Sequence, residues 1–154
     1  MKLERKAELK SEYYRGEMFA RAGASQAHNL LAGNLFADLH NQLRRRPSLV
    51  YSSDMRVRVS ATGLYACPDV SVVCGQPHLA DDQADVLLNP TLIAEVLSPS
   101  TEAYDRGLKF EHYRAIESLF EYLLVARERV HVDLYRRQPD GQWRLSEASR
   151  LEDT

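Results

Sequence analysis

Two short apolar segments, each with a single carboxylate, constrain the fold of this chain most strongly. Thr91–Leu97 is apolar apart from Glu95, and turn residues follow it directly. Asp69–Cys74 is rich in valine and begins directly after Pro68. Short apolar runs bounded by turn residues are typical of buried strands. If these two strands are neighbours in one sheet, Asp69 and Glu95 lie within a few ångströms of each other.

A carboxylate within an apolar strand needs a partner, because burying an unpaired charge costs several kcal/mol. Taken alone, Glu95 is best interpreted as a residue on a solvated edge strand or as the partner of an arginine. The second carboxylate, Asp69, favours a metal site. Two adjacent carboxylates repel each other, and a hard cation such as Mg²⁺ relieves that repulsion with oxygen ligands. A water on such an ion is a ready nucleophile for phosphodiester hydrolysis.

The rest of the chain predicts one α/β domain over residues 1–154. Leucines recur every four residues and predict a helix from Gln26 to Arg46, with Ser25 as its N-cap. Other patterns predict a hairpin over Ser11–Ala22 with its turn at Arg15-Gly16, a second helix over Arg106–Ile116 and a loop over Ala80–Asn89. Further strands are predicted over Met55–Val59, Phe120–Ala126 and Val130–Arg136, with a weak one around Trp143. Glu4–Lys10 is predicted to be a charged lead-in or a short helix. This order predicts a mixed sheet flanked by helices.

Composition narrows the functional classes. The net charge of −2 counts modestly against a pure DNA-binding module, but not against an enzyme whose carboxylates hold a metal ion. The chain has no apolar run near the ~20 residues that span a bilayer and no opening signal peptide, so we expect a cytoplasmic protein without a membrane span. Cys67 and Cys74 match no zinc spacing, and we expect both to be buried or half-buried strand residues. Arg44, Arg45 and Arg46 are expected to form a solvated helix end.

Short motifs follow one another along nearly the whole chain in a recognisable order. The two central ones are Pro68–Val73 and Glu95–Thr101, and the others are Tyr104–Lys109, Tyr113-Arg114, Glu121–Leu123, Arg15–Glu17, His28 and Ser53–Val57. In this order they resemble the Uma-two family of putative restriction endonucleases. That family belongs to the PD-(D/E)XK nuclease superfamily.

The resemblance implies a restriction-endonuclease-like core, with a central mixed sheet, helices on both sides and a metal site at one sheet edge. Asp69 would correspond to the aspartate of the PD motif and Glu95 to the acidic residue of the (D/E)XK motif. The backbone carbonyl of Val96 would be a further ligand of Mg²⁺ or Mn²⁺. Glu17 resembles an acidic position of the family and is a candidate outer ligand, although an exposed strand carboxylate explains it equally well.

One position departs from the superfamily pattern. The lysine expected two residues after Glu95, on the same strand face, is replaced by Leu97. In the Uma-two family a lysine on the following helix is the natural substitute, and here that residue is Lys109. Its ammonium could orient the attacking water or stabilise developing negative charge, whereas the alternative is a helix-surface ion pair with Asp105. His28 could contact phosphate or water, but a hydrogen-bonded structural role is favoured.

These observations lead to three functional hypotheses. The first is a Mg²⁺- or Mn²⁺-dependent DNA endonuclease in which Asp69 and Glu95 hold the metal, a metal-activated water attacks phosphorus and Lys109 assists. The second is a nuclease-like module that binds DNA or a protein without cutting. The third is an RNA or structure-specific nuclease. DNA is the expected partner of the first, and a homodimer is expected because one small domain cuts one strand.

Overall fold

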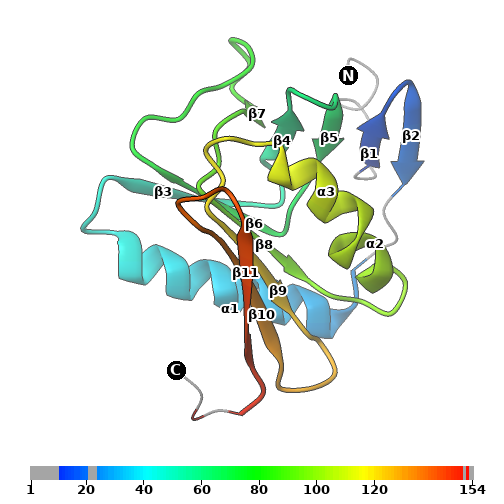
Figure 1. Ribbon diagram of the computed structural model, residues 1–154, viewed down its shortest axis with the longest axis vertical. Helices are drawn as coiled ribbons and strands as arrows, with labels where there is room; N and C mark the ends of the chain where they lie inside the picture. Colours follow the sequence, from blue (N-terminus) through cyan, green and yellow to red (C-terminus); the bar gives the residue numbers. More distant parts are fainter. Residues whose placement is uncertain (1–10, 21–23, 151, 153–154) are drawn as a thin grey trace.

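The computed structural model describes residues 11–20, 24–150 and 152, which form two sheets and three helices (Figure 1). Sheet A has the strand order β2-β1-β5-β4-β7, and sheet B has the order β11-β10-β9-β8-β6-β3. In chain order the elements are β1 (Ser11–Tyr14), β2 (Glu17–Ala20), α1 (Gln26–Leu43), β3 (Ser48–Ser52), β4 (Arg56–Val59), β5 (Leu64–Ala66), β6 (Val70–Cys74), β7 (Val86–Leu87), β8 (Leu92–Val96), α2 (Glu102–Arg106), α3 (Leu108–Arg114), β9 (Glu121–Val125), β10 (Val132–Arg137) and β11 (Trp143–Ala148).

Sheet B is the mixed sheet that the sequence predicts. Its strands β8 and β9 are parallel, and the remaining neighbours pair antiparallel. Helix α1 packs along β3, β6 and β8. On α3, the ring of Phe110 contacts Tyr122 of β9, Tyr135 of β10 and Trp143 of β11. Figure 1 shows α1 and the α2–α3 pair on different sides of this sheet, so the predicted fold class is confirmed.

One apolar core joins the two sheets to α3. Val57 and Leu64 enter it from sheet A, Ile93 and Leu124 enter from sheet B, and Tyr113 enters from α3. All five are almost completely shielded from water. Full burial of a valine- or leucine-sized side chain contributes about 1.5–3 kcal/mol, so this shared core holds α3 against the end of sheet B.

Sheet A and three short strands are absent from the sequence-based expectation, which had one sheet only. The strands β3 and β5 were not expected, and β7 lies inside the predicted loop Ala80–Asn89. Each is short, and β7 has only two residues. The partners of β3 and β7 are distant in sequence, and β5 pairs both with its neighbour β4 and with the distant strand β1. Strand preference reflects packing against such neighbours more than intrinsic propensity, which explains why local patterns did not reveal them.

The second predicted helix, Arg106–Ile116, is two helices instead of one. Helix α2 begins earlier, at Glu102, and Gly107 separates it from α3 with a backbone far from helical geometry (φ −104°, ψ −102°). A Cβ at Gly107 would lie 3.0 Å from the Ala103 carbonyl oxygen, closer than almost all real contacts. Glycine therefore permits the break that orients α3.

Other expectations are corrected in detail. Helix α1 ends at Leu43 rather than Arg46, although Ser25 caps it as predicted, accepting from the His28 amide at 3.2 Å. Cys67 is buried but lies outside any strand, and Cys74 is a strand residue but exposed. The predicted segment Glu4–Lys10 and the end of the hairpin at 21–22 lie outside the described residues. Within them, no helix is long and apolar enough to cross a membrane.

Candidate functional site

The register of β6 and β8 places the two predicted carboxylates opposite each other. In this antiparallel pair Val70 faces Ala94, and one further residue along the same register brings Asp69 opposite Glu95. Residues directly opposite in an antiparallel pair present their side chains on one face, with Cβ atoms about 4.5–5.5 Å apart. The Asp69 amide donates to Glu95 Oε2 at 3.4 Å. The structure therefore brings these two side chains together at one end of sheet B.

Asp69 is fixed by groups from two different elements. Its Oδ2 accepts the Val96 amide at 2.8 Å, and its Oδ1 lies 2.9 Å from His28 Nε2 in the first turn of α1. An ionised carboxylate can accept hydrogen bonds but cannot donate them, so His28 donates to Asp69 through Nε2. His28 is thus hydrogen-bonded, as the sequence favoured, and its partner is one of the candidate metal ligands. The Val96 carbonyl lies at the carboxyl end of β8, and its role as a ligand stays a prediction.

Lys109 lies in the interior and joins three carboxylates. Its Nζ is 2.8 Å from Glu95 Oε1, 2.8 Å from Glu12 Oε1 and 3.3 Å from Asp105 Oδ1, and its side chain is 2% exposed. Burial by itself lowers the pKa of Lys109, but the charges of Glu95, Glu12 and Asp105 outweigh it and raise the pKa well above the usual value. Because Lys109 and Asp105 are both buried, a helix-surface pair does not describe this arrangement.

Three tyrosines hold the carboxylates and the helix in place. Tyr113 donates to Glu95 Oε1 at 3.1 Å, Tyr104 donates to Glu12 Oε2 at 3.1 Å, and Tyr122 donates to the Asp105 carbonyl at 2.9 Å. Burial, followed by nearby carboxylates, raises the pKa of both Tyr104 and Tyr122. These two hydroxyls therefore remain donors throughout the neutral range.

Alkaline pH is expected to destabilise the protein through this cluster. The folded-state pKa values of Lys109 and Tyr122 lie well above their ordinary values of 10.5 and 10.0. The unfolded chain therefore loses these protons first, and stability falls as the pH rises from about 10 toward the folded-state values. Thermal melts at pH 8 and pH 11 should show a large drop for wild type and a smaller one for Tyr122→Phe. Tyr65→Phe, on β5, is the matched control, and a wild-type melting temperature that is equal at both pH values contradicts the expectation.

Glu12 is the site residue that sequence reasoning missed, and Glu17 is the one that the structure does not bring in. Glu17 is exposed on β2, and among residues 11–20 and 24–150 it makes no hydrogen bond or ion pair with Asp69 or Glu95. Glu12 is buried on β1 and reaches Lys109. Both glutamates share one face of the hairpin, but β2 is the edge strand of sheet A. The available sequence signal for Glu12 was that two aromatic residues, Tyr13 and Tyr14, directly follow it.

Comparison with known proteins places the chain in a family. The family model described as "Putative restriction endonuclease", Uma2, matches residues 1–154. The chain belongs to the Uma2 family. This confirms the resemblance that the ordered motifs around Asp69 and Glu95 indicated.

Two relatives match most of the length of this Uma2 chain, and one solved structure shares its fold. Two uncharacterised proteins of Synechocystis sp., slr1290 and sll1609, are each 40% identical to it, over 134 and 144 residues. They match 87% and 94% of this chain, and 70% and 81% of their own lengths. The crystal structure of a putative nuclease belonging to DUF820, from Anabaena variabilis, shares a TM-score of 0.78 at 16% identity, covering 96% of this chain and 80% of that one. At this identity the likeness shows a shared fold.

A second group of possible metal ligands lies just before β10 and on β10 and β11 of the Uma2 chain. This group consists of His131, Asp133 and Glu147, whose ligand atoms all lie within 4.8 Å of one another. In the described part of the chain it is the only group of three or more histidine, cysteine or acidic residues that lie this close together. Asp133 already accepts from Arg106, and its Oδ1 is 2.8 Å from His131 Nε2. Glu147 is 60% exposed. The Arg106 guanidinium compensates Asp133, so we interpret this group as an ion-pair network.

Proposed function

We propose that this chain is a metal-dependent DNA endonuclease that holds Mg²⁺ or Mn²⁺ between Asp69 and Glu95. The observation that carries the proposal is the register that sets these two carboxylates opposite each other at one end of sheet B. Family membership supports a nuclease, and the carboxylate pair supports hydrolysis assisted by a metal ion. The same pair would serve little purpose in a core that only needed apolar packing.

The chemistry of the donor set fits a hard divalent cation. Asp69 and Glu95 supply carboxylate oxygens, and the Val96 carbonyl would be the third oxygen ligand, in accordance with the preference of Mg²⁺. When bound, the cation would offset phosphate charge and lower the pKa of a water molecule. His28 and the Val96 amide hold Asp69 in one orientation, as groups behind metal ligands commonly do.

Lys109 would fill the role that Leu97 leaves empty. Its ammonium adjoins Glu95 from α3 rather than from β8. There it would fix the direction of the Glu95 carboxylate and add positive potential where negative charge develops on the phosphate. One positive charge faces three carboxylates in this cluster, which keeps the local field favourable for a divalent cation.

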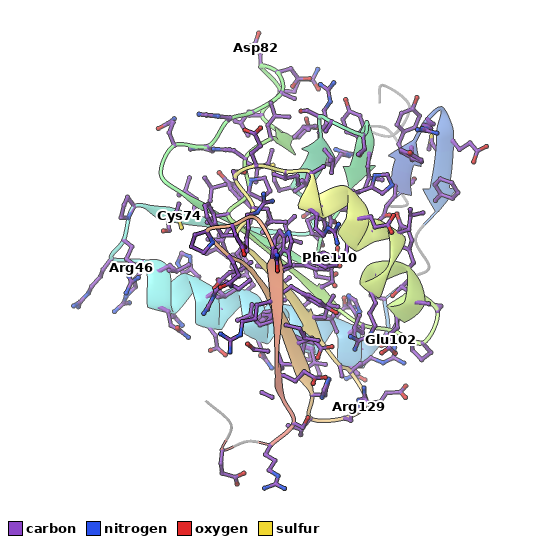
Figure 2. All side chains as sticks on the ribbon, viewed as in Figure 1. Arg46, Cys74, Asp82, Glu102, Phe110 and Arg129 are labelled. Carbon is purple, nitrogen blue, oxygen red and sulfur yellow. The ribbon has the colours of Figure 1, made fainter. Side chains whose placement is uncertain are left out.

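Plasmid nicking tests the proposal directly. Supercoiled DNA should be converted to nicked and linear forms with Mg²⁺ or Mn²⁺, and should stay intact with EDTA. Asp69→Asn should abolish conversion. Asp82→Asn, which changes an exposed carboxylate at the tip of the loop before β7, is the matched control (Figure 2). Intact plasmid with every divalent metal, together with cleavage of a single-stranded RNA, would move the assignment to an RNA nuclease.

The second candidate is a nuclease-like module that binds DNA or protein without cutting. Two observations favour it: Leu97 replaces the usual lysine, and Lys109 is already engaged by three carboxylates. DNA retention without nicking under any divalent metal is its expected result. We also infer that the nuclease acts as a homodimer, because two copies are needed to cut both strands. Light scattering during gel filtration measures the molar mass in solution and so distinguishes a monomer from a dimer.

A further inference from the structure

A pocket of about 250 Å³ opens at the carboxyl ends of β8 and β9. Its lining includes Leu97 and Ser98, which directly follow β8, as well as Arg127 and Arg129, which follow β9. Leu97 lies two residues beyond Glu95 along the chain. The carboxyl ends of neighbouring parallel strands are the usual place for ligands in open α/β sheets.

The Arg127 side chain is anchored to the same helix turn that orients Asp69. One guanidinium nitrogen donates to Ser25 Oγ at 3.1 Å, and Ser25 is the N-cap of α1. His28, three residues later, binds Asp69 at 2.9 Å. Arg127 is therefore fixed to the candidate metal site through one turn of α1, and its side chain is only 19% exposed.

The other end of the guanidinium is held by a partner that an anion could replace. Arg127 donates to Glu128 Oε1 at 2.9 Å, but the Glu128 side chain is 70% exposed. Ion pairs with such exposed carboxylates are weak, because water screens them. The pocket's other acid, Glu102, is already paired with Arg106 at 3.0 Å. Figure 2 shows Glu102 and Arg129 at the same end of the molecule, far from Arg46.

We propose that this pocket binds a backbone phosphate of the DNA strand that is cut, next to the scissile phosphate. Arg127 would be the main ligand of this neighbouring phosphate. The inference rests on the proposed nuclease function and names where the substrate strand lies on the protein. A planar guanidinium binds phosphate with two parallel hydrogen bonds, so Arg127 can exchange Glu128 for phosphate while Ser25 keeps it in place. The strand would then run from the carboxylate pair across the end of β9. Arg129, exposed at the pocket rim, adds a weaker contact.

Two substitutions with opposite expected effects test the subsite. Binding of a short fluorescein-labelled duplex is measured by anisotropy, with Ca²⁺ in place of Mg²⁺. Arg127→Ala should weaken binding about tenfold and lower the slope of log K against log salt by about one phosphate contact. Glu128→Gln should strengthen binding about two- to fivefold, because it removes the acid that competes for Arg127.

Arg136→Ala is the matched control, since Arg136 is 60% exposed and pairs with Glu121 at the other end of β9. It should leave affinity and salt slope unchanged. Because Arg127→Ala also removes the Ser25 contact, Glu128→Gln keeps the test independent of that anchor. Wild type that binds and nicks DNA, with Arg127→Ala and Glu128→Gln both unchanged, overturns the subsite alone. Wild type that binds no duplex overturns the subsite and the proposed function together.

Discussion

Lys109→Ala is expected to lower the free energy of unfolding by about 3–5 kcal/mol. The substitution removes the ammonium that three buried carboxylates share, and breaking a buried pair from one side leaves uncompensated charge. Urea unfolding followed by circular dichroism measures it. Arg114→Ala, on the exposed face of the same helix, should cost no more than about 1 kcal/mol, the scale of its exposed cation–π contact with Phe110. A loss below about 1 kcal/mol for Lys109→Ala would mean that water screens the cluster.

The same substitution should lower metal-dependent cleavage about a hundredfold, the scale of one lost charge-stabilising donor. Activity is compared at a temperature where both proteins are folded. If the role of Lys109 is only structural, Lys109→Ala and Asp105→Ala both leave cleavage almost unchanged. Equal rates for wild type and Lys109→Ala contradict the catalytic assignment of Lys109.

Glu95→Gln is expected to abolish metal binding and cleavage, and to cost less stability than Lys109→Ala. Relief of repulsion with Asp69 would by itself leave the fold as stable or more stable. The structure adds an opposing effect, because Glu95 Oε1 accepts from Lys109 and Tyr113. Lys109 keeps two other carboxylates, so we expect a loss of about 1–3 kcal/mol.

Calorimetric titration with Mn²⁺ and thermal melts measure these two effects of Glu95→Gln. Glu111→Gln is the matched control, since Glu111 is an exposed carboxylate on α3. Undiminished Mn²⁺ affinity in Glu95→Gln removes Glu95 from the metal site. A stability loss as large as that of Lys109→Ala would instead make Glu95 chiefly a structural partner of Lys109.

The part of the fold that sequence could predict is the part with strong local patterns. Strands β6 and β8 are short apolar runs. Asp69 directly precedes β6 and Glu95 lies within β8, so the local sequence predicted both the strands and their carboxylates. Helix α1 has leucines at four-residue spacing and a capping serine. The strand β7 has only two residues and exists through its pairing with β4, which no local pattern encodes.

The sequence could not predict that Glu12 belongs to the site, because this depends on which hairpin strand is an inner strand of sheet A. Glu12 and Glu17 lie on one face of the hairpin, and only the neighbouring strand β5 makes β1 an inner strand. The direction of α3 likewise depends on the break at Gly107. Lys109 could be singled out by resemblance, but its three buried partners required the tertiary arrangement.

A crystal structure of the protein soaked with Mn²⁺ tests directly whether Asp69 and Glu95 hold a metal ion. Anomalous scattering locates Mn²⁺ without ambiguity about other light ions. We expect one strong peak in contact with Asp69, Glu95 and the Val96 carbonyl, at about 2.1 Å from the oxygens. Glu95→Gln crystals soaked identically should lack it. A peak only at His131, Asp133 and Glu147, or none in either crystal, would contradict a metal site between Asp69 and Glu95.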